Sequence, residues 1–215
     1  MDDKLRRGTV VLVHGLWLSG WTLYFLRYRL QRFGFDACTF SYASVNQNLL
    51  ENAETLHRYM RTLGAPVVHL VGHSLGGLVI RALLHQHPEQ PPGRVVTLGA
   101  PHRGSYPARI LARTMVGRKI TGRSIQQLLA GFPEHWEMPP RDFGVIAGNL
   151  SLGMGRLFPG LPKPNDGVVT LAETQLAGAS DYITLHVSHT AMIVSKRVAR
   201  QVCHFLDYGR FAHAA

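Results

Sequence analysis

Short apolar runs rich in β-branched residues alternate with segments of helical periodicity along most of the chain. Runs of this length and composition favour buried strands, and we place them at 10–14, 37–42, 67–72, 94–98, 143–147 and 182–186. Strands that are apolar on both faces and separated by helices are typical of a parallel sheet covered on both sides. The pattern predicts an α/β fold with a doubly wound, mainly parallel sheet of about six strands.

The segments between these runs predict the helices. We expect one helix over 19–33, opened by a capping Ser19, and another over 48–63 that stops at Gly64. A third follows Ser74 and ends near Pro88, and a last one covers 190–206. Leu, Val, Ala and Met recur at helical spacing in these segments, which is first of all a sign of packing.

The stretch from 104 to 141 breaks this alternation, because no strand follows the fourth apolar run for almost forty residues. Helical patterns at 107–116 and 124–130 predict a small helical cap or lid over the strand ends. At 215 residues the chain is large enough for one buried core and small for two. We therefore expect a single domain over 1–215 that contains the cap as an insertion at 104–141.

Composition narrows the class of protein. Apolar residues make up 46% and charged residues 17%, an ordinary globular balance. The two cysteines, Cys38 and Cys203, lie in apolar surroundings, so we expect buried, unpaired thiols. The charged N-terminus has no apolar signal segment, and no stretch is long and apolar enough to cross a bilayer, which predicts a cytoplasmic protein.

The net charge is +10, but the basic residues are scattered and no aromatic-interleaved motif for reading bases is present. We therefore expect no nucleic-acid partner. The densest basic group follows the fourth apolar run and comprises Arg109, Arg113, Arg118, Lys119 and Arg123. A solvated face explains it most simply, and peripheral contact with an anionic membrane or an acidic substrate is the alternative.

The motif Gly72-His73-Ser74-Leu75-Gly76 joins the third apolar run directly to a helical pattern. Gly-x-Ser-x-Gly in a strand-turn-helix context places the serine on a tight, strained turn and exposes its hydroxyl at the end of the sheet. The start of the helix also favours negative charge. Ser74 is the candidate nucleophile.

A serine needs a histidine base, and the base needs a carboxylate to orient it. Asp166 follows the fifth apolar run in a Pro-Asn-Asp-Gly turn, and His189 follows the sixth, just before the last helix. Both positions lie where the carboxyl ends of strands meet. Three rival acids fit less well. Glu173 is expected on a helix, whereas Asp142 and Asp181 precede their strands.

His186 is expected inside the last strand as a core residue, and His14 and His73 are read as structural neighbours of the motifs. Backbone N–H groups of Leu75 and Leu16 are the expected oxyanion donors, because Gly15 lets the loop after the first strand approach the serine. Apolar and aromatic residues near Ser74 are expected to contact the substrate: Trp17, His73, Leu161 and Val168.

Five segments in order resemble the lipases and esterases of the α/β-hydrolase superfamily, including small bacterial lipases and hydrolases related to GPI inositol-deacylases. They are Val-His-Gly-Leu-Trp at 13–17, Gly-His-Ser-Leu-Gly-Gly-Leu-Val at 72–79, Leu-Gly-Ala-Pro-His-Arg-Gly-Ser at 98–105, Asn-Asp-Gly-Val-Val at 165–169 and Ser-His-Thr at 188–190. The resemblance implies a minimal α/β-hydrolase fold and hydrolysis of carboxylic esters through an acyl-Ser74 intermediate. His189 would move the proton, Asp166 would hold the imidazolium, and no metal or organic cofactor would be needed.

The expected substrates are short- to medium-chain acyl esters or lipids. Two alternatives stay open: an acyltransferase or amidase with the same residues, and an inactive hydrolase fold that only binds a ligand.

Overall fold

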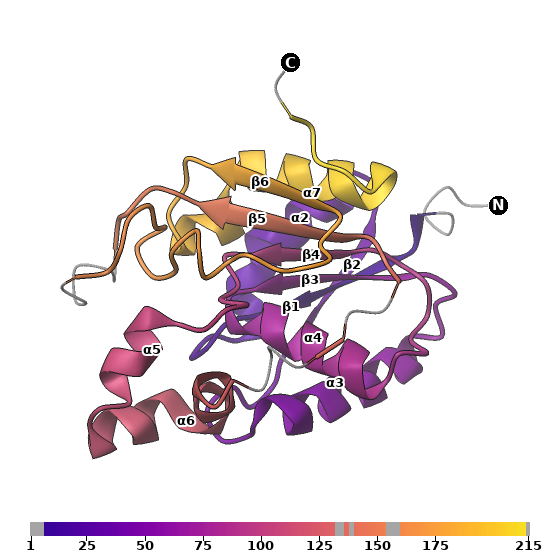
Figure 1. The fold of residues 1–215 in the computed structure, drawn as a ribbon. Coiled ribbons are helices and arrows are strands. Elements are labelled where there is room, and N and C mark those ends of the chain that lie inside the picture. Colours follow the sequence, from indigo (N-terminus) through magenta and orange to yellow (C-terminus); the bar gives the residue numbers. More distant parts are fainter. Residues whose placement is uncertain (1–6, 132–135, 138–139, 154–159, 214–215) are drawn as a thin grey trace.

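A computed structural model describes residues 7–131, 136–137, 140–153 and 160–213. Six parallel strands form one sheet in the order β2-β1-β3-β4-β5-β6 (Figure 1). The strands are β1 (Thr9–Val13), β2 (Asp36–Phe40), β3 (Val68–His73), β4 (Val95–Leu98), β5 (Phe143–Gly148) and β6 (Asp181–Leu185). The predicted parallel sheet is confirmed, and the predicted strand ends differ from these by two residues at most.

Helices cover both faces of the sheet, as the doubly wound fold requires. The helices α2 (Tyr24–Arg32) and α7 (Lys196–Tyr208) lie together on one face, and α3 (Leu49–Leu63) and α4 (Leu75–Gln86) lie on the other (Figure 1). Each face has its own cluster of buried apolar side chains. The four central strands β1, β3, β4 and β5 are buried on both sides, which explains their apolar sequences, whereas the edge strands β2 and β6 are only partly buried.

The helix over 48–63 is confirmed, but two other predicted helices are divided. Asn48 caps α3 in a capping box with Glu51, and Gly64 ends it in a left-handed conformation. The segment 19–33 consists of the 3-10 helix η1 (Gly20–Leu23) and α2, and the Ser19 side chain makes no capping bond. The segment 190–206 is likewise divided, into η4 (Thr190–Val194) and α7, because Ser195 caps a new helix.

Beyond the fourth strand the chain forms α5 (Tyr106–Leu111) and α6 (Met115–Leu129), near the carboxyl ends of the strands (Figure 1). The predicted boundaries at 107–116 and 124–130 were wrong. The hydroxyl of Thr114 accepts a hydrogen bond from the N–H of Gly117 and so starts α6 early. Gly122, with φ of 74°, interrupts α6 near its middle.

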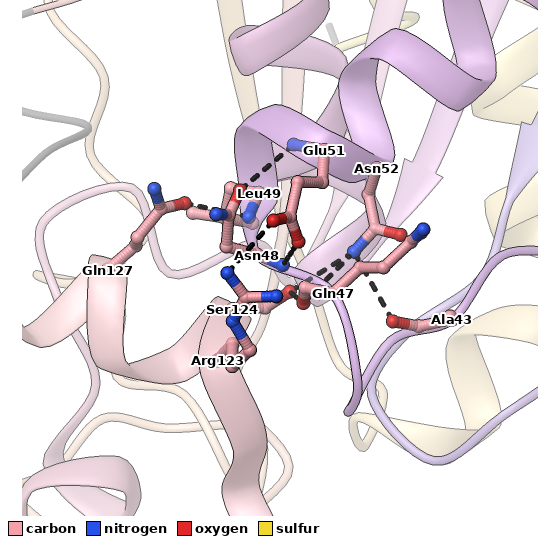
Figure 2. A network of polar contacts seen from close by, with 9 residues as sticks. All are labelled: Ala43, Gln47, Asn48, Leu49, Glu51, Asn52, Arg123, Ser124 and Gln127. Atoms are coloured by element: carbon pink, nitrogen blue, oxygen red, sulfur yellow. Dashed lines mark hydrogen bonds and ion pairs between the residues drawn. The ribbon is translucent and has the colours of Figure 1, made fainter.

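Polar contacts hold the second half of α6 against the start of α3 (Figure 2). Arg123 forms an ion pair with Glu51 at 2.9 Å, and the amide of Asn52 donates to the hydroxyl of Ser124 at 3.2 Å. Gln127 accepts from the first backbone N–H of α3 at 2.7 Å. The Gln127 side chain thereby satisfies an N–H group that cannot be paired within α3 itself, and the other two contacts join side chains of the two helices.

Both cysteines are free thiols, and Cys203 is buried as predicted, whereas Cys38 is only partly buried. Burial raises the pKa of the Cys203 thiol to about 12, which disfavours a reactive thiolate. Within the described residues, no helix is both long enough and apolar enough to cross a lipid bilayer.

Candidate active site

Ser74 lies on the turn between β3 and α4 with φ of 54° and ψ of −122°, a strained conformation for a residue with a side chain. The N–H of Ser74 donates to the carbonyl of Leu98 at 2.9 Å. A Cβ atom on Gly76 would lie 2.3 Å from the carbonyl oxygen of Val13, and one on Gly72 would lie 2.6 Å from the nitrogen of Gly77. The two motif glycines therefore allow strand and helix to approach closely enough for this turn.

The serine lines a mainly apolar cavity of about 210 Å³. The wall of the cavity also contains the predicted base His189 and the predicted oxyanion residues Leu16 and Leu75. These residues come from the loops after β1, β3 and β6, which the parallel sheet brings to one edge. The structure therefore brings together four of the predicted site residues at a single cavity.

Two backbone donors lie free beside Ser74. Among the described residues, neither the N–H of Leu16 nor that of Leu75 has a hydrogen-bond partner. Leu75 is the first residue of α4, where unsatisfied N–H groups and the helix dipole favour negative charge. Such groups can bind an oxyanion without reorganisation.

Buried contacts shape the loop that carries Leu16. The Nδ1–H of His14 donates to the carbonyl of Gly15 at 2.8 Å, and its Nε2 accepts from the N–H of Tyr42 at 3.3 Å. The hydroxyl of Tyr42 donates to the carbonyl of His14 at 2.8 Å, and the two rings stack with centroids 4.3 Å apart. Burial lowers the pKa of His14, so this side chain stays neutral and structural, as predicted.

Asp166 and His189 form a buried, hydrogen-bonded pair. The Nδ1 of His189 lies 2.7 Å from Oδ2 of Asp166, and a carboxylate oxygen can only accept, so Nδ1 carries the hydrogen. The other carboxylate oxygen accepts from the N–H groups of Val168 and Val169 at 2.9 and 2.7 Å. These bonds fix the carboxylate and leave the lone pair of His189 on Nε2.

No hydrogen bond joins Ser74 directly to His189 among the described contacts. Both residues line the same cavity, and hydrogen bonds between catalytic groups are often long before a substrate binds. The arrangement supplies a hydroxyl, an imidazole and two N–H donors around one space. Acyl transfer through a serine requires this set.

His73, between the motif glycine and Ser74, also contacts His189, the predicted base. Its Nε2–H donates to the backbone carbonyl of His189 at 3.1 Å, and the two rings lie 4.8 Å apart. Burial, together with the neighbouring His189, lowers the pKa of His73 to about 3. A protonated His189 would therefore face a neutral neighbour.

Most predicted substrate-contact residues lie at the cavity. Trp17, His73 and Val168 line it, whereas Leu161 is partly buried and is not among the described lining residues. The rival acids lie elsewhere: Asp142 forms an ion pair with Arg94 at 2.8 Å, and Asp181 holds the C-terminal segment through the N–H of Phe211. Asp142 directly precedes β5, as predicted, and Asp181 is the first residue of β6, so both lie at the amino ends of strands.

Glu173 was predicted on a helix, but the structure places it in a turn. Its carboxylate accepts from the N–H groups of Tyr106 and Thr170 and so joins the start of α5 to the Asp166 loop. His186 is exposed one residue after β6 and contacts Asn149, so its predicted core position was wrong. At the end of β6 Thr184 is exposed and Leu185 is buried, so the alternation of side chains turns His186 outward.

One histidine-glutamate group among the described residues, His57, His87 and Glu89, has ligand atoms within 4.8 Å of one another. Its imidazoles stack face to face at 3.8 Å, so their lone pairs do not converge on one point. His57 is already bonded to Gln90, and His87 to Glu54. The group does not line the cavity, and it offers no metal ligand to Ser74.

The family model described as Alpha/beta hydrolase family matches residues 10–204. The chain belongs to the alpha/beta hydrolase family. A comparison with curated protein sequences gives no match.

Solved structures share the fold of this alpha/beta hydrolase at low sequence identity. The mature lipase BlEst2 of Bacillus licheniformis is 22% identical with a TM-score of 0.79, and 94% of this chain and 91% of that chain are covered. The metagenomic carboxyl esterase MGS0156 is 19% identical with a TM-score of 0.70, at 89% and 72% coverage. Phospholipase PlaB of Legionella pneumophila is 18% identical with a TM-score of 0.61, at 78% and 44% coverage.

Sequence reasoning missed several residues of this alpha/beta hydrolase site. Gly99, with φ of 57°, packs against the buried pair, where a Cβ would lie 2.9 Å from Oδ2 of Asp166 and 3.0 Å from Nδ1 of His189. Its place directly after β4 was the available signal. Part of the cavity wall comes from α5 and α6 and includes Leu111 and Ile125. These residues show only the apolar spacing of a packed helix, so their place at the cavity could not be predicted.

Proposed function

We propose that this alpha/beta hydrolase is a serine esterase that cleaves carboxylic esters through an acyl-Ser74 intermediate. The observation that carries the proposal is the buried Asp166–His189 pair, which lines one cavity with a strained serine and two unpartnered N–H groups. The lipases and esterases among the structural neighbours support the same reaction class.

In the proposed mechanism, the ester carbonyl lies over Ser74 with its oxygen toward the N–H groups of Leu16 and Leu75. Nε2 of His189 takes the hydroxyl proton as Oγ attacks, and Asp166 stabilises the resulting imidazolium. The tetrahedral oxyanion is held by the two N–H groups, each of which contributes about 3 to 4 kcal/mol in such sites. His189 then returns the proton to the leaving alcohol, and water repeats the sequence to release the acid.

The cavity favours short- to medium-chain acyl groups. At about 210 Å³ the cavity is smaller than the roughly 300–1,000 Å³ of pockets that hold drug-sized ligands, which fits an acyl chain of modest length. The lining is mainly apolar and includes Leu111, Ile125 and Val168, which suits an acyl chain rather than a charged group. We further propose that residues 104–141 act as the cap of this pocket, within one domain formed by the whole chain.

The experiment is a series of p-nitrophenyl esters from acetate to palmitate, measured with the native protein, Ser74→Ala and the exposed-serine control Ser151→Ala. We expect kcat/KM to be highest for butyrate to octanoate, to be unchanged in the control and to be lost in Ser74→Ala. Equal hydrolysis by native protein and Ser74→Ala would contradict the proposal and favour a ligand-binding role.

A competing alcohol distinguishes hydrolysis from acyl transfer. Water and the added alcohol compete for the acyl group on Ser74, and an acyltransferase converts most of it to the new ester, whereas a hydrolase releases mostly the free acid. Amides of the same acyl group test the amidase alternative, which predicts that they are hydrolysed at rates comparable to those of the esters.

A further inference from the structure

The part of α6 before its break at Gly122 carries an exposed apolar surface. We call residues 113–120, between the end of α5 and this break, the cap tip. Met115, Val116 and Ile120 are 87%, 69% and 49% exposed. Gly117 faces inward against α5, where a Cβ would lie 1.9 Å from the carbonyl oxygen of Leu111. Gly117 thus packs against α5, while the three apolar side chains of the tip keep about half or more of their surface exposed.

Unpaired positive charge surrounds these side chains. The stretch 104–131 holds five basic residues and no Asp or Glu. Two of the five are neutralised by the body of the protein: Arg109 contacts Glu173 at 3.6 Å, and Arg123 contacts Glu51 at 2.9 Å.

The three basic residues at the tip itself are different. Arg113, Arg118 and Lys119 are exposed and form no ion pair with any described residue. Arg118 uses one guanidinium N–H to hold the carbonyl of Ala112 at 2.7 Å, and its charge stays uncompensated. Apolar side chains and unpaired cations thus occupy the same eight residues.

The cap tip lies beside the cavity of Ser74. The indole N–H of Trp17 donates to the carbonyl of Ile120 at 2.9 Å, and Trp17 lines the cavity while remaining 46% exposed. Thr121, the next residue of α6, lines the cavity as well. A partner seated on the tip would therefore lie close to the substrate space.

We propose that the cap tip is a docking surface for an anionic lipid bilayer. Met115, Val116 and Ile120 enter the head-group region, while Arg113, Arg118 and Lys119 contact lipid phosphates. Three unpaired cations oppose contact with the same surface of a second copy of this chain. The tip stands out from the body of the protein, which suits a broad, deformable surface (Figure 1). This docking goes beyond the proposed esterase function and does not depend on it.

A second exposed surface on α2 provides a comparison. It is a groove that contains Tyr24, Phe25 and Tyr28, with basic residues from α2 and α7 at its edge. Its rings already contact one another and the chain's own cations: Tyr24 stacks with Tyr28, and Arg29 lies 5.9 Å from the ring centre of Phe25. Nothing in the structure shows what would cover this groove, so it is the control and not the proposal.

The test measures sedimentation of the Ser74→Ala protein with vesicles of phosphatidylcholine, alone or mixed with phosphatidylglycerol. We expect binding to the mixed vesicles only, and weaker binding as salt rises. Each tip cation should contribute about fivefold to binding, so Arg118→Gln with Lys119→Gln should weaken it more than tenfold. Met115→Ser with Val116→Ser should weaken it by a similar factor because two apolar side chains lose their buried environment.

Two control pairs complete the design. Arg58→Gln with Arg61→Gln removes the same charge from exposed positions on α3, and Phe25→Ser with Tyr28→Ser alters the α2 groove. Both should bind vesicles like the parent. Absence of binding to anionic vesicles would overturn the proposal. Loss of binding in either control pair, while the tip variants still bind, would overturn it as well. So would self-association through the cap tip in place of vesicle binding.

Hydrolysis of a soluble butyrate ester separates this test from that of the esterase function. Tip variants made in the active protein should keep their kcat/KM for this ester, which also shows that they fold. Vesicle binding without any esterase activity would refute the proposed function alone, and activity without vesicle binding would refute the docking surface alone.

Discussion

Replacing Gly99 with alanine should damage the site without removing any of its functional groups. The new methyl carbon would lie 2.9 Å from Oδ2 of Asp166 and 3.0 Å from Nδ1 of His189, both closer than ordinary van der Waals contact. The pair is buried, and Val168 and Val169 hold the carboxylate from the other side, so neither group can retreat freely. The methyl group must therefore displace the imidazole.

Gly64→Ala is a matched control for the backbone. Gly64 has φ of 58° and Gly99 has φ of 57°, so alanine meets the same left-handed penalty of about 1 to 2 kcal/mol at both positions. No atom lies within 4 Å of a Cβ at Gly64. Overpacking adds about 1 to 3 kcal/mol at Gly99 alone. Urea unfolding should therefore show Gly99→Ala to be the less stable of the two variants.

Activity separates the variants more clearly than stability. A displacement on the order of 1 Å at a catalytic group can cost about 100-fold in rate, so we expect such a fall in kcat for Gly99→Ala and none for Gly64→Ala. Rates of butyrate ester hydrolysis measure this at a temperature where both variants are folded. Equal kcat values for the two variants would refute the close packing of Gly99 against the Asp166–His189 pair.

Three further outcomes are expected. Asp166→Asn should lower kcat by about 10⁴ with little change in fold, because an amide no longer fixes the tautomer of His189. The control Asp142→Asn, at the exposed ion pair, should leave kcat near native. Similar kcat values in the two variants would contradict the assignment of Asp166. The pKa of His73 is lowered to about 3 in the folded protein. Below pH 6.5 the unfolded chain takes up a proton at this residue and the folded protein does not, so the free energy of unfolding falls by up to about 1.4 kcal/mol per pH unit. Above pH 6.5 the contribution of His73 to this free energy is complete. Urea unfolding at pH 6.5 and 5.5 should show this loss, and His73→Gln should reduce it; equal pH dependence would contradict a buried, neutral His73. Asn48→Ala removes the cap of α3 and should lower the unfolding free energy by about 1 kcal/mol at unchanged kcat, and an unchanged unfolding free energy would contradict the cap.

The strands and the residues beside them could be predicted because their signals are local. A parallel strand buried on both faces is apolar throughout. Ser74 directly follows β3, and Asp166 and His189 lie in the loops after β5 and β6, so all three fall at the carboxyl edge of the sheet. Helix boundaries depended instead on single hydrogen bonds. Ser195 begins a new helix inside a segment whose periodicity predicted one continuous helix. Thr114 begins α6 inside a segment that was predicted to belong to the preceding helix.

The interior wall and the supporting contacts could not be predicted from sequence. Gly99 and Leu111 carry no chemical group that marks them, and their roles arise only from the distance between segments far apart in the chain. The exposed position of His186 follows from side-chain alternation at the end of β6, where Thr184 is exposed and Leu185 is buried. The apolar run alone did not show which of these positions face the core.

Covalent labelling with a serine-directed phosphonate, followed by peptide mapping, tests most directly whether Ser74 is the nucleophile. The account predicts one adduct per chain, on Ser74, with loss of ester hydrolysis in proportion to labelling and no adduct in Ser74→Ala. An adduct on Ser105, which lines the same cavity, or full activity in a protein fully labelled at Ser74, would contradict it.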